Sequence, residues 1–334
     1  MSESVTIKIP GKLFIAGEYA VARPQGEALI AAVETDFVIS VSESSGNSRL
    51  ETNVNLPTLD FDINNFEIPD NGWNFALCAL RNLLQGQNRA GLTLKKYPQL
   101  TIKINSELGY GENKKGYGSS ASVVVGIVKA VNQFMKLKID KSKAFEYAAK
   151  AHFEIQGSGS MGDVASILSG GIIYYQSPDV NWQNWKIENS ELYHPQWQAY
   201  IVMTGKSVKT GDKLKINLTE KFYETSDEIV NKIKALNQKK YFEQKKFQLF
   251  KKLILANQSL LADTLPEGYV TEKLAFALNI INRQENLVGK ISGSGFGENI
   301  IVFAKNEKGI KKVTGQLARK GISIEKIRIA DEQW

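Results

Sequence analysis

A glycine- and serine-rich stretch, KKGYGSSAS (residues 114–122), runs directly into VVVGIVKAVNQF, an apolar sequence with helical spacing. The first backbone N–H groups of a helix lack intrahelical partners and carry partial positive charge, so a helix start can hold an anion. Glycines let the backbone approach a ligand, and serine hydroxyls can bind phosphate oxygens or a hydrated metal ion; here these residues are Gly116, Gly118, Ser119, Ser120 and Ser122. The stretch therefore predicts an anion-binding helix start, and an ordinary serine cap after a glycine turn is the alternative.

Two further glycine-serine loops follow, GSGSMGD (residues 157–163) and SGSGFGE (residues 292–298). Each loop alone is consistent with a glycine turn, and the last one with a corner between two strands. Asp163 closes the second loop, however, and Lys12 ends the N-terminal sequence IPGK. Anion-binding N–H groups, a metal ligand, a cation and an orienting carboxylate are what phosphoryl transfer requires. The combination favours a phosphoryl-transfer enzyme.

Two common nucleotide-binding folds are excluded by context. Residues 157–162 match the dinucleotide pattern GxGxxG, but a helical sequence precedes them and the first part of the chain shows no βαβ alternation. Gly205-Lys206-Ser207 resembles the end of a Walker A loop, but Tyr200 stands where its first glycine is required. We therefore expect neither a Rossmann fold nor a P-loop.

Composition limits the class of protein. The 334 residues, 43% hydrophobic and 23% charged, are typical of a globular chain long enough for two domains. One cysteine and two histidines are too few for a dedicated zinc site, and we expect Cys78 to be a small buried hydrophobe. No run of 18 uncharged apolar residues and no secretory signal occur, so we expect a cytoplasmic protein without a membrane segment.

The charge balance fits an acidic small-molecule ligand, with weak nucleic-acid affinity as the alternative. Lysine and arginine number 42 against 35 acidic residues, and the aromatic residues are not interleaved with lysines as in a nucleic-acid platform. We therefore predict no nucleic-acid partner. The lysine-rich segment KKYFEQKKFQLFKK (residues 239–252) alternates with apolar residues at helical spacing and predicts a solvated helix face.

The elements that position these residues can be predicted from periodicity. The first third reads as strands (VTIKI, LIAAVETDFVISVSES, LTIKINSE) interrupted by a helix over Trp73–Gln87. Two helices from Ser119, a glycine loop and a strand, GGIIYYQS, complete a first domain of residues 1–177. Residues 178–334 predict a strand, long amphipathic helices, two strands, a helix and a final strand. We therefore predict an α+β fold with antiparallel strands.

Three segments of the chain resemble, in order, the three motifs of the GHMP small-molecule kinases (galacto-, homoserine, mevalonate and phosphomevalonate kinases). IPGKLFIAGEYAV is similar to the first motif, KGYGSSAS to the second and KISGSGFGEN to the third, and together they span nearly the whole chain. GEYAV, QGSGSMGDVAS and VMTGKS resemble the bacterial phosphomevalonate kinases of the family. The resemblance implies a ribosomal-S5-like first domain, a ferredoxin-like second domain, and transfer of phosphate from ATP to 5-phosphomevalonate, giving 5-diphosphomevalonate, in the mevalonate route to isoprenoids.

The resemblance also implies roles for single residues. Lys12 would contact the transferred phosphoryl group, Asp163 would orient the acceptor, and Ser120 would bind Mg²⁺. The expected ATP-binding residues are Gly116, Tyr117, Gly118, Ser119, Ser120 and Ala121. The expected substrate-binding residues are Tyr19, Ser160, Lys206, Ser292, Gly293 and Gly295. We expect the protein to be a monomer or a homodimer.

Two departures from the family pattern leave questions open. The third motif ends Gly297-Glu298-Asn299 instead of glycine-aspartate-cysteine, so Glu298 receives no role. The carboxylate that supports magnesium in mevalonate kinases falls at His152, with Glu154 two residues away, so the second metal ligand stays open.

Three other functions remain as alternatives. In a mevalonate kinase the acceptor is a neutral hydroxyl, and Asp163 would have to accept its proton. The related decarboxylase is another choice, but a complete-looking kinase site gives no reason to prefer it. A non-catalytic, nucleotide-dependent sensor could share the fold, but the presence of Lys12, Ser120 and Asp163 argues against it.

Overall fold

The computed structural model describes residues 3–89, 96–108, 116–178, 186–189, 197–204, 216–238, 243–297, 299–332 and 334. The chain forms two compact units that do not follow the order of the sequence. Unit 1 comprises residues 1–11, 34–169 and 332–334, and unit 2 comprises residues 12–33 and 170–331. Strands β1 (Ser4–Ala16) and β2 (Glu27–Glu43) run from one unit into the other. The boundary at residue 177 stays a prediction.

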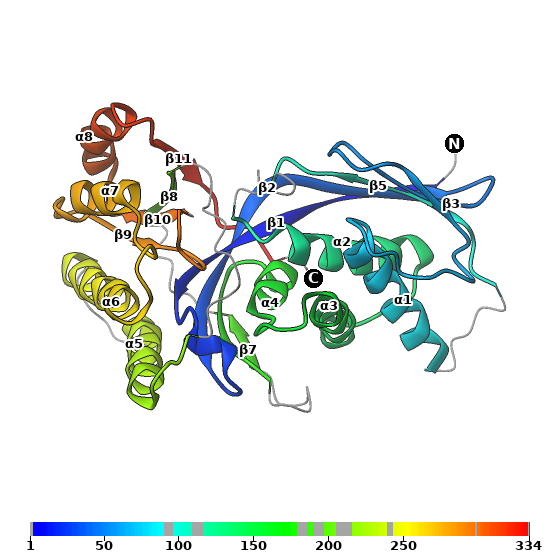
Figure 1. Cartoon of the computed structure of the whole chain (residues 1–334), viewed down its shortest axis with the longest axis horizontal. Helices are drawn as coiled ribbons and strands as arrows, with labels where there is room; N and C mark the ends of the chain where they lie inside the picture. The colour runs from blue at the N-terminus through cyan, green and yellow to red at the C-terminus, as the bar shows by residue number, and fades with distance from the viewer. Residues whose placement is uncertain are drawn as a thin grey trace. The chain divides into compact units, whose positions relative to one another are not determined.

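Unit 1 is a sheet covered by helices (Figure 1). Its strand order is β4-β3-β5-β2, where β2 pairs antiparallel with β5 and β3 pairs parallel with β5. Figure 1 shows α1, α2 and α3 on one face of this sheet. The elements are β3 (Ser48–Thr52), β4 (Leu59–Phe61), α1 (Asn74–Arg89), β5 (Leu100–Asn105), α2 (Ser119–Met135), α3 (Lys141–Gln156) and α4 (Gly162–Ser169).

Helix α2 lies close against the sheet because it carries a glycine at the contact. A Cβ atom at Gly126 would lie only 2.5 Å from Ile39 Cδ1 of β2. The apolar side of α2 is buried, including Val124, Ile127 and Val128. This packing fixes the helix axis, and therefore the position of the glycine-serine loop at the helix start.

Unit 2 contains a second, four-stranded sheet with the order β11-β8-β10-β9, and every neighbouring pair is antiparallel. From β8 to β11, strands and helices alternate along the chain as in a ferredoxin-like βαββαβ unit. Three helices, α5 to α7, lie between β8 and β9. The elements are η1 (Ala20–Ala22), β6 (Ile172–Gln176), β7 (Lys186–Asn189), β8 (Gln198–Met203), α5 (Glu220–Gln238), α6 (Glu243–Thr264), α7 (Glu272–Asn282), β9 (Leu287–Ile291), β10 (Ile300–Ala304), α8 (Glu307–Ala318) and β11 (Ser323–Ile327). The predicted α+β fold class is confirmed.

Both faces of this second sheet are buried. Val302 belongs to a core cluster that includes residues of α7 and α8. The next residue, Phe303, contacts Phe250 of α6 edge to face, with the ring centroids 5.1 Å apart. Phe247 is also buried, whereas Lys245 and Lys252 are exposed. The predicted amphipathic helix is therefore confirmed for the described part of residues 239–252.

Some elements were not predicted. Strands β3, β4 and β7 have only three to five residues each, too few to show a clear period. Helix α4 begins within the second glycine loop, at Gly162, and has eight residues, so its pattern is also short. None of the helices in the described part of the chain is long and apolar enough to cross a membrane.

Candidate active site

The loop before α2 has the backbone conformation that its glycines predict. Gly116 and Gly118 have positive φ values of 75° and 80°, and Gly118 is the residue before the first helical turn. No side chain caps this helix start, so the ordinary serine cap is not formed. The N–H groups of the first turn are therefore available to an anion.

One of the three serines serves the fold instead of a ligand. The Ser122 hydroxyl donates to the carbonyl oxygen of Pro10 at 3.0 Å and is itself buried. A Cβ atom at Gly11 would lie 2.8 Å from Tyr117 Cβ, so Gly11 packs closely against the loop before α2. Ser122 and Gly11 thus hold the loop in place, and the suggestion that Ser122 binds phosphate is wrong.

Ser120, His152 and Asp163 lie together beside the start of α2. His152 Nε2 is 3.1 Å from Ser120 Oγ and 3.9 Å from Asp163 Oδ2. The histidine is buried, and the Asp163 side chain is 22% exposed in the first turn of α4. Three elements, α2, α3 and α4, therefore bring one hydroxyl, one imidazole and one carboxylate to the same place.

The left-handed backbone of the second glycine loop sets the direction of Asp163. Gly159 and Met161 have φ values of 123° and 60°, and Gly162 then starts α4. The Gly162 N–H donates to Ser160 Oγ at 3.3 Å. This tight turn follows α3 directly, so the GxGxxG match does not belong to a Rossmann fold.

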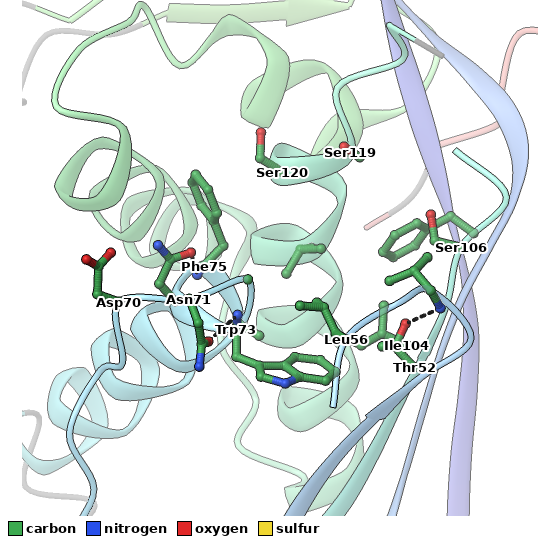
Figure 2. Close-up of a pocket in the computed structure, with 16 residues that line it drawn as sticks. Thr52, Leu56, Asp70, Asn71, Trp73, Phe75, Ile104, Ser106, Ser119 and Ser120 are labelled. Atoms are coloured by element: carbon green, nitrogen blue, oxygen red, sulfur yellow. Dashed lines mark hydrogen bonds between the residues drawn. The ribbon is translucent and has the colours of Figure 1, made fainter. Parts of the chain in front are cut away.

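A pocket of about 380 Å³ extends from the start of α2 into unit 1 (Figure 2). Ser119 and Ser120 line it beside Asp70 and Asn71, and the remaining wall is mostly apolar. The apolar lining residues include Phe37, Val54, Leu56, Trp73, Phe75, Ile104 and Val123. Such a mixture, polar at a helix start and apolar beyond it, suits a molecule that joins a phosphate group to a flat ring.

No pattern of residues in the sequence predicts this pocket. Trp73 is buried and donates from Nε1 to the carbonyl oxygen of Pro57 at 2.8 Å. Its backbone N–H bonds to Asn71 Oδ1 at 2.9 Å. These contacts fix the loop before α1 against the segment between β3 and β4. Thr52 of β3 and Ile104 of β5 line the same pocket, so only the fold brings its walls together.

Magnesium fits the oxygen donors beside α2. Mg²⁺ prefers one or two protein oxygens and takes its other ligands from phosphates and water. Ser120 Oγ and the Asp163 carboxylate supply such donors, and no group of three or more His, Cys, Asp or Glu residues suited to a metal occurs in the part of the chain that the structure describes. The donor set therefore suits a metal that arrives with a nucleotide.

Glu154 does not reach this cluster. It forms an ion pair with Arg81 and accepts a hydrogen bond from Cys78 Sγ at 3.3 Å. Burial, together with the Glu154 carboxylate, raises the pKa of the Cys78 thiol to about 12. The prediction that Cys78 is a small buried residue is confirmed. His152, and not a second carboxylate, lies beside Ser120 and Asp163.

In unit 2 the third glycine loop, residues 292–297, connects β9 to the antiparallel strand β10. Gly293 and Gly295 have φ values of 95° and 83°, and a Cβ atom at Gly295 would lie 2.2 Å from the Tyr269 ring. Ser292 Oγ is buried and has no hydrogen-bond partner among the described residues. The loop thus forms a corner between two strands, which was the alternative expected for it. It also offers the Ser292 hydroxyl, which has no partner among the described residues.

Two other predicted site residues lie in unit 2. The Tyr19 hydroxyl donates to the carbonyl oxygen of Ser294 at 2.6 Å, which joins the first motif to the third. Lys12 Nζ lies 5.4 Å from the centroid of the Phe14 ring. Lys206 lies outside the described residues, as does Glu298.

Comparison with protein families gives two matches in the expected order. The model of the GHMP kinases N terminal domain matches residues 74–171, and that of the GHMP kinases C terminal domain matches residues 238–323. Together they cover more than half of the chain. The chain belongs to the GHMP kinase family.

Individual GHMP kinases are similar to different extents. A phosphomevalonate kinase from a Streptomyces species is 32% identical over 183 residues, which are 51% of this chain and 49% of that protein. A mevalonate kinase from Saccharolobus solfataricus is 25% identical and covers 91% of both chains. The similarity to the first relative thus spans about half of its length.

A solved structure shares the fold along nearly the whole chain. The Streptococcus pneumoniae phosphomevalonate kinase in complex with phosphomevalonate and AMPPNP aligns with a TM-score of 0.78, at 21% identity, over 96% of this chain and 99% of that chain. At this level of identity the likeness shows the fold alone.

Proposed function

We propose that the protein is an ATP- and magnesium-dependent kinase that phosphorylates 5-phosphomevalonate. The observation that carries the proposal is the grouping of Ser120, His152 and Asp163 at the uncapped start of α2, next to the 380 Å³ pocket. The half-length similarity to a phosphomevalonate kinase supports the choice of acceptor.

The nucleotide would occupy unit 1. Its phosphates would accept hydrogen bonds from the N–H groups at Gly118, Ser119 and Ser120, and its base would enter the apolar pocket beside Trp73. Ser120 and the phosphates would hold magnesium, which when bound offsets the negative charge of the phosphate oxygens. His152 positions the Ser120 hydroxyl by the 3.1 Å contact.

The acceptor chemistry requires orientation more than proton removal. A phosphate monoester has a second pKa of about 6 and is mostly dianionic at neutral pH. Asp163, beside His152, would orient the acceptor without having to act as a strong base. Lys12 would offset the repulsion between two phosphate groups, while Tyr19, Ser160 and Ser292 would contact the substrate.

The test is a release assay for ADP with purified protein and one acceptor at a time: mevalonate, 5-phosphomevalonate, homoserine or galactose. The proposal predicts the highest kcat/KM with 5-phosphomevalonate and no turnover without Mg²⁺. Equal or better turnover with mevalonate would contradict it. No ADP release with any acceptor would favour the non-catalytic sensor.

Mevalonate kinase is the second candidate because the archaeal mevalonate kinase aligns along 91% of the chain. In that case the acceptor is a neutral hydroxyl, and Asp163 would accept its proton. We also propose a cytoplasmic location and a monomer or homodimer, to be checked by fractionation and by light scattering.

A further inference from the structure

A buried ion pair in unit 2 connects the first and third motifs. Glu18 Oε1 pairs with Lys290 Nζ, and their side chains are 2% and 0% exposed. Lys290 also donates to the carbonyl oxygen of Ile291, and Asn257 Nδ2 donates to Glu18 Oε2 at 3.4 Å. Neither residue belongs to the predicted site. A buried pair is costly to desolvate and is therefore weak evidence for stability alone.

The pair is part of a cluster of four buried polar side chains, Glu18, Asn257, Gln258 and Lys290. On one side, Asn257 Oδ1 accepts from the Gly17 N–H at 3.4 Å. On the other side, Gln258 Oε1 accepts from the Ile291 N–H at 2.8 Å. Two successive residues of α6 therefore hold the backbone of the first motif and the end of β9, respectively.

The cluster lies at the base of two loops with restricted backbones. Gly17 has a φ of 90°, and a Cβ atom there would lie 2.2 Å from the carbonyl oxygen of Glu27. Tyr19 has a φ of 64°, which is uncommon for a residue with a side chain. Lys290 is two residues before Ser292, where the third glycine loop begins. The residues on either side of Glu18 are therefore held in unusual conformations.

A second contact joins the same loops farther along. The Tyr19 hydroxyl donates to the Ser294 carbonyl oxygen at 2.6 Å. With the ion pair at the base and this hydrogen bond beyond it, the two loops are connected at two separate points. Two points of attachment fix the direction of Tyr19 relative to the buried, unpaired Ser292 hydroxyl.

We infer that Glu18 and Lys290 are positioning residues, which hold Tyr19 and Ser292 in register to bind an anionic phosphoryl acceptor. The inference rests on the proposed function for the identity of the acceptor. It deepens that function because it assigns part of acceptor binding to a preformed group of side chains within unit 2. Nucleotide binding in the pocket of unit 1 is independent of this group.

The charge of Lys290 depends on its partner. Burial lowers the pKa of Lys290, and the Glu18 carboxylate opposes this effect. Glu18→Gln removes the counter-ion of the buried Lys290 amine. Lys290→Met removes the counter-ion of the buried Glu18 carboxylate. Each single change should lower the melting temperature. The double change Glu18→Gln/Lys290→Met keeps the volumes and removes both charges, so it should recover stability.

The experiment compares the two single variants, the double variant and the wild type. For the double variant we expect a melting temperature near that of the wild type, a KM for 5-phosphomevalonate raised on the order of 10- to 100-fold, and an unchanged dissociation constant for ADP. A purely structural pair predicts instead that acceptor kinetics recover together with stability. That result would overturn the inference.

Hydrogen exchange tests, without any assay of activity, whether the Glu18–Lys290 pair holds the two loops. Peptides that contain residues 17–21 and 292–297 should both exchange faster in the double variant. If both keep the exchange rates of the wild type, the inference is wrong, even where the acceptor of the enzyme proves to be mevalonate. Failure of the proposed function would appear separately, in the acceptor preference of the wild type.

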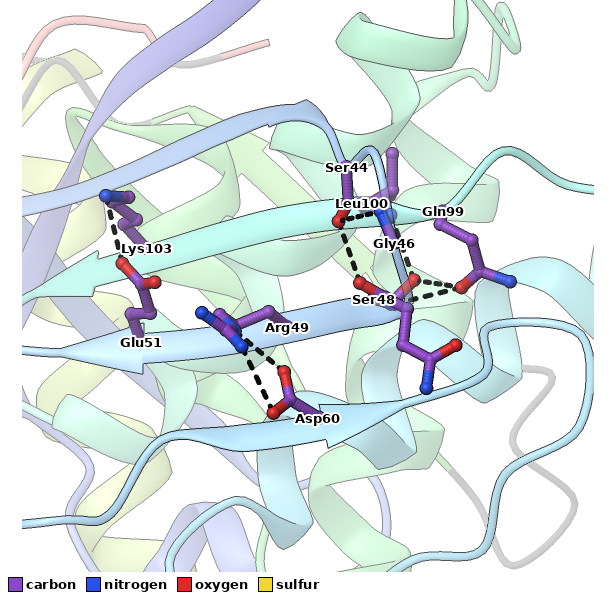
Figure 3. A network of polar contacts seen from close by, with 10 residues as sticks. Ser44, Gly46, Ser48, Arg49, Glu51, Asp60, Gln99, Leu100 and Lys103 are labelled. Atoms are coloured by element: carbon purple, nitrogen blue, oxygen red, sulfur yellow. Dashed lines mark hydrogen bonds and ion pairs between the residues drawn. The ribbon is translucent and has the colours of Figure 1, made fainter.

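The exposed ion pair of Arg49 and Asp60 provides the matched control (Figure 3). It joins β3 to β4 in unit 1, with N–O distances of 2.7 and 3.2 Å, and both side chains are about half exposed. Arg49→Met/Asp60→Asn should leave the acceptor KM and the exchange of both loops unchanged. A similar rise in KM in this variant would show that loss of any ion pair is sufficient, and would overturn the inference.

Discussion

The glycine-serine loops at residues 116–120 and 292–297 have similar compositions and different surroundings. The first precedes a long helix, has no side-chain cap and adjoins a pocket. The second connects two paired strands and is fixed by backbone contacts, including the Phe296 N–H to the Tyr269 carbonyl oxygen at 3.0 Å. The difference shows that the element after a glycine loop, more than its composition, determines whether its N–H groups can serve a ligand.

The largest expected effect comes from Asp163, beside the first loop. Asp163→Asn should lower kcat on the order of 10²-fold or more, because loss of the orienting carboxylate misplaces the acceptor phosphate. With 5-phosphomevalonate, the acidic limb of the rate profile should persist in the variant, because it follows ionisation of the acceptor phosphate near pH 6. Loss of that limb would instead assign a proton-accepting role to Asp163. Glu154→Gln is the control and should change kcat little, because Glu154 pairs with Arg81.

Ser120 should show the next largest effect. Ser120→Ala should reduce magnesium-dependent turnover roughly 10- to 100-fold, with little change in stability, because the hydroxyl serves a ligand and alanine is accepted in helices. Titration with Mg²⁺ and a thermal melt measure the two effects. A lower melting temperature with normal specific activity would make Ser120 a structural residue.

Two glycines of the loop at residues 292–297 allow effects on ligand binding to be separated from effects on folding. Both have positive φ, so a side chain strains either position by about 1–3 kcal/mol. Gly295→Val additionally forces atoms into the Tyr269 ring and should lower the melting temperature more than Gly293→Val. Gly293→Val should instead raise the KM of substrate or nucleotide. Unchanged kinetics in the folded Gly293→Val protein would show that the loop connects two strands without binding substrate or nucleotide.

Ser122, in the first loop, should behave in the opposite way to Ser120. Among the described residues, its hydroxyl bonds to the backbone oxygens of Pro10 and Gly118. Ser122→Ala should therefore cost about 1 kcal/mol of unfolding free energy, measured by urea denaturation. The Mg²⁺ dependence of turnover should not change. A shifted Mg²⁺ dependence would indicate that Ser122 contributes to ligand binding.

The smallest effect is expected at Cys78, the single cysteine of the chain. With a pKa of about 12, only about one thiol in ten thousand is ionised at pH 8, and the thiolate is the reactive form. A thiol reagent should therefore leave the folded enzyme fully active and should label it only after unfolding. Rapid labelling of the folded protein would contradict the buried environment.

Much of this protein can be predicted from its sequence. Long periodic segments gave α2, α3, α6 and α7, and the three ordered motifs gave the family. Ser119, Ser120 and Asp163 were expected to serve one reaction, and they do lie in the same unit, with Ser120 and Asp163 on either side of His152. Their catalytic roles, and that of Lys12, stay predictions.

The tertiary structure decided which polar residues are available to a ligand. Sequence could not separate Ser120 from Ser122, because a shift of two residues on α2 turns one hydroxyl to His152 and the other to Pro10. It also gave no reason to connect Glu18 with Lys290, which lie 272 residues apart in the sequence and form a buried pair. Local patterns determine helices and loops because those depend on neighbouring residues, whereas burial and partner choice depend on segments that only folding brings together.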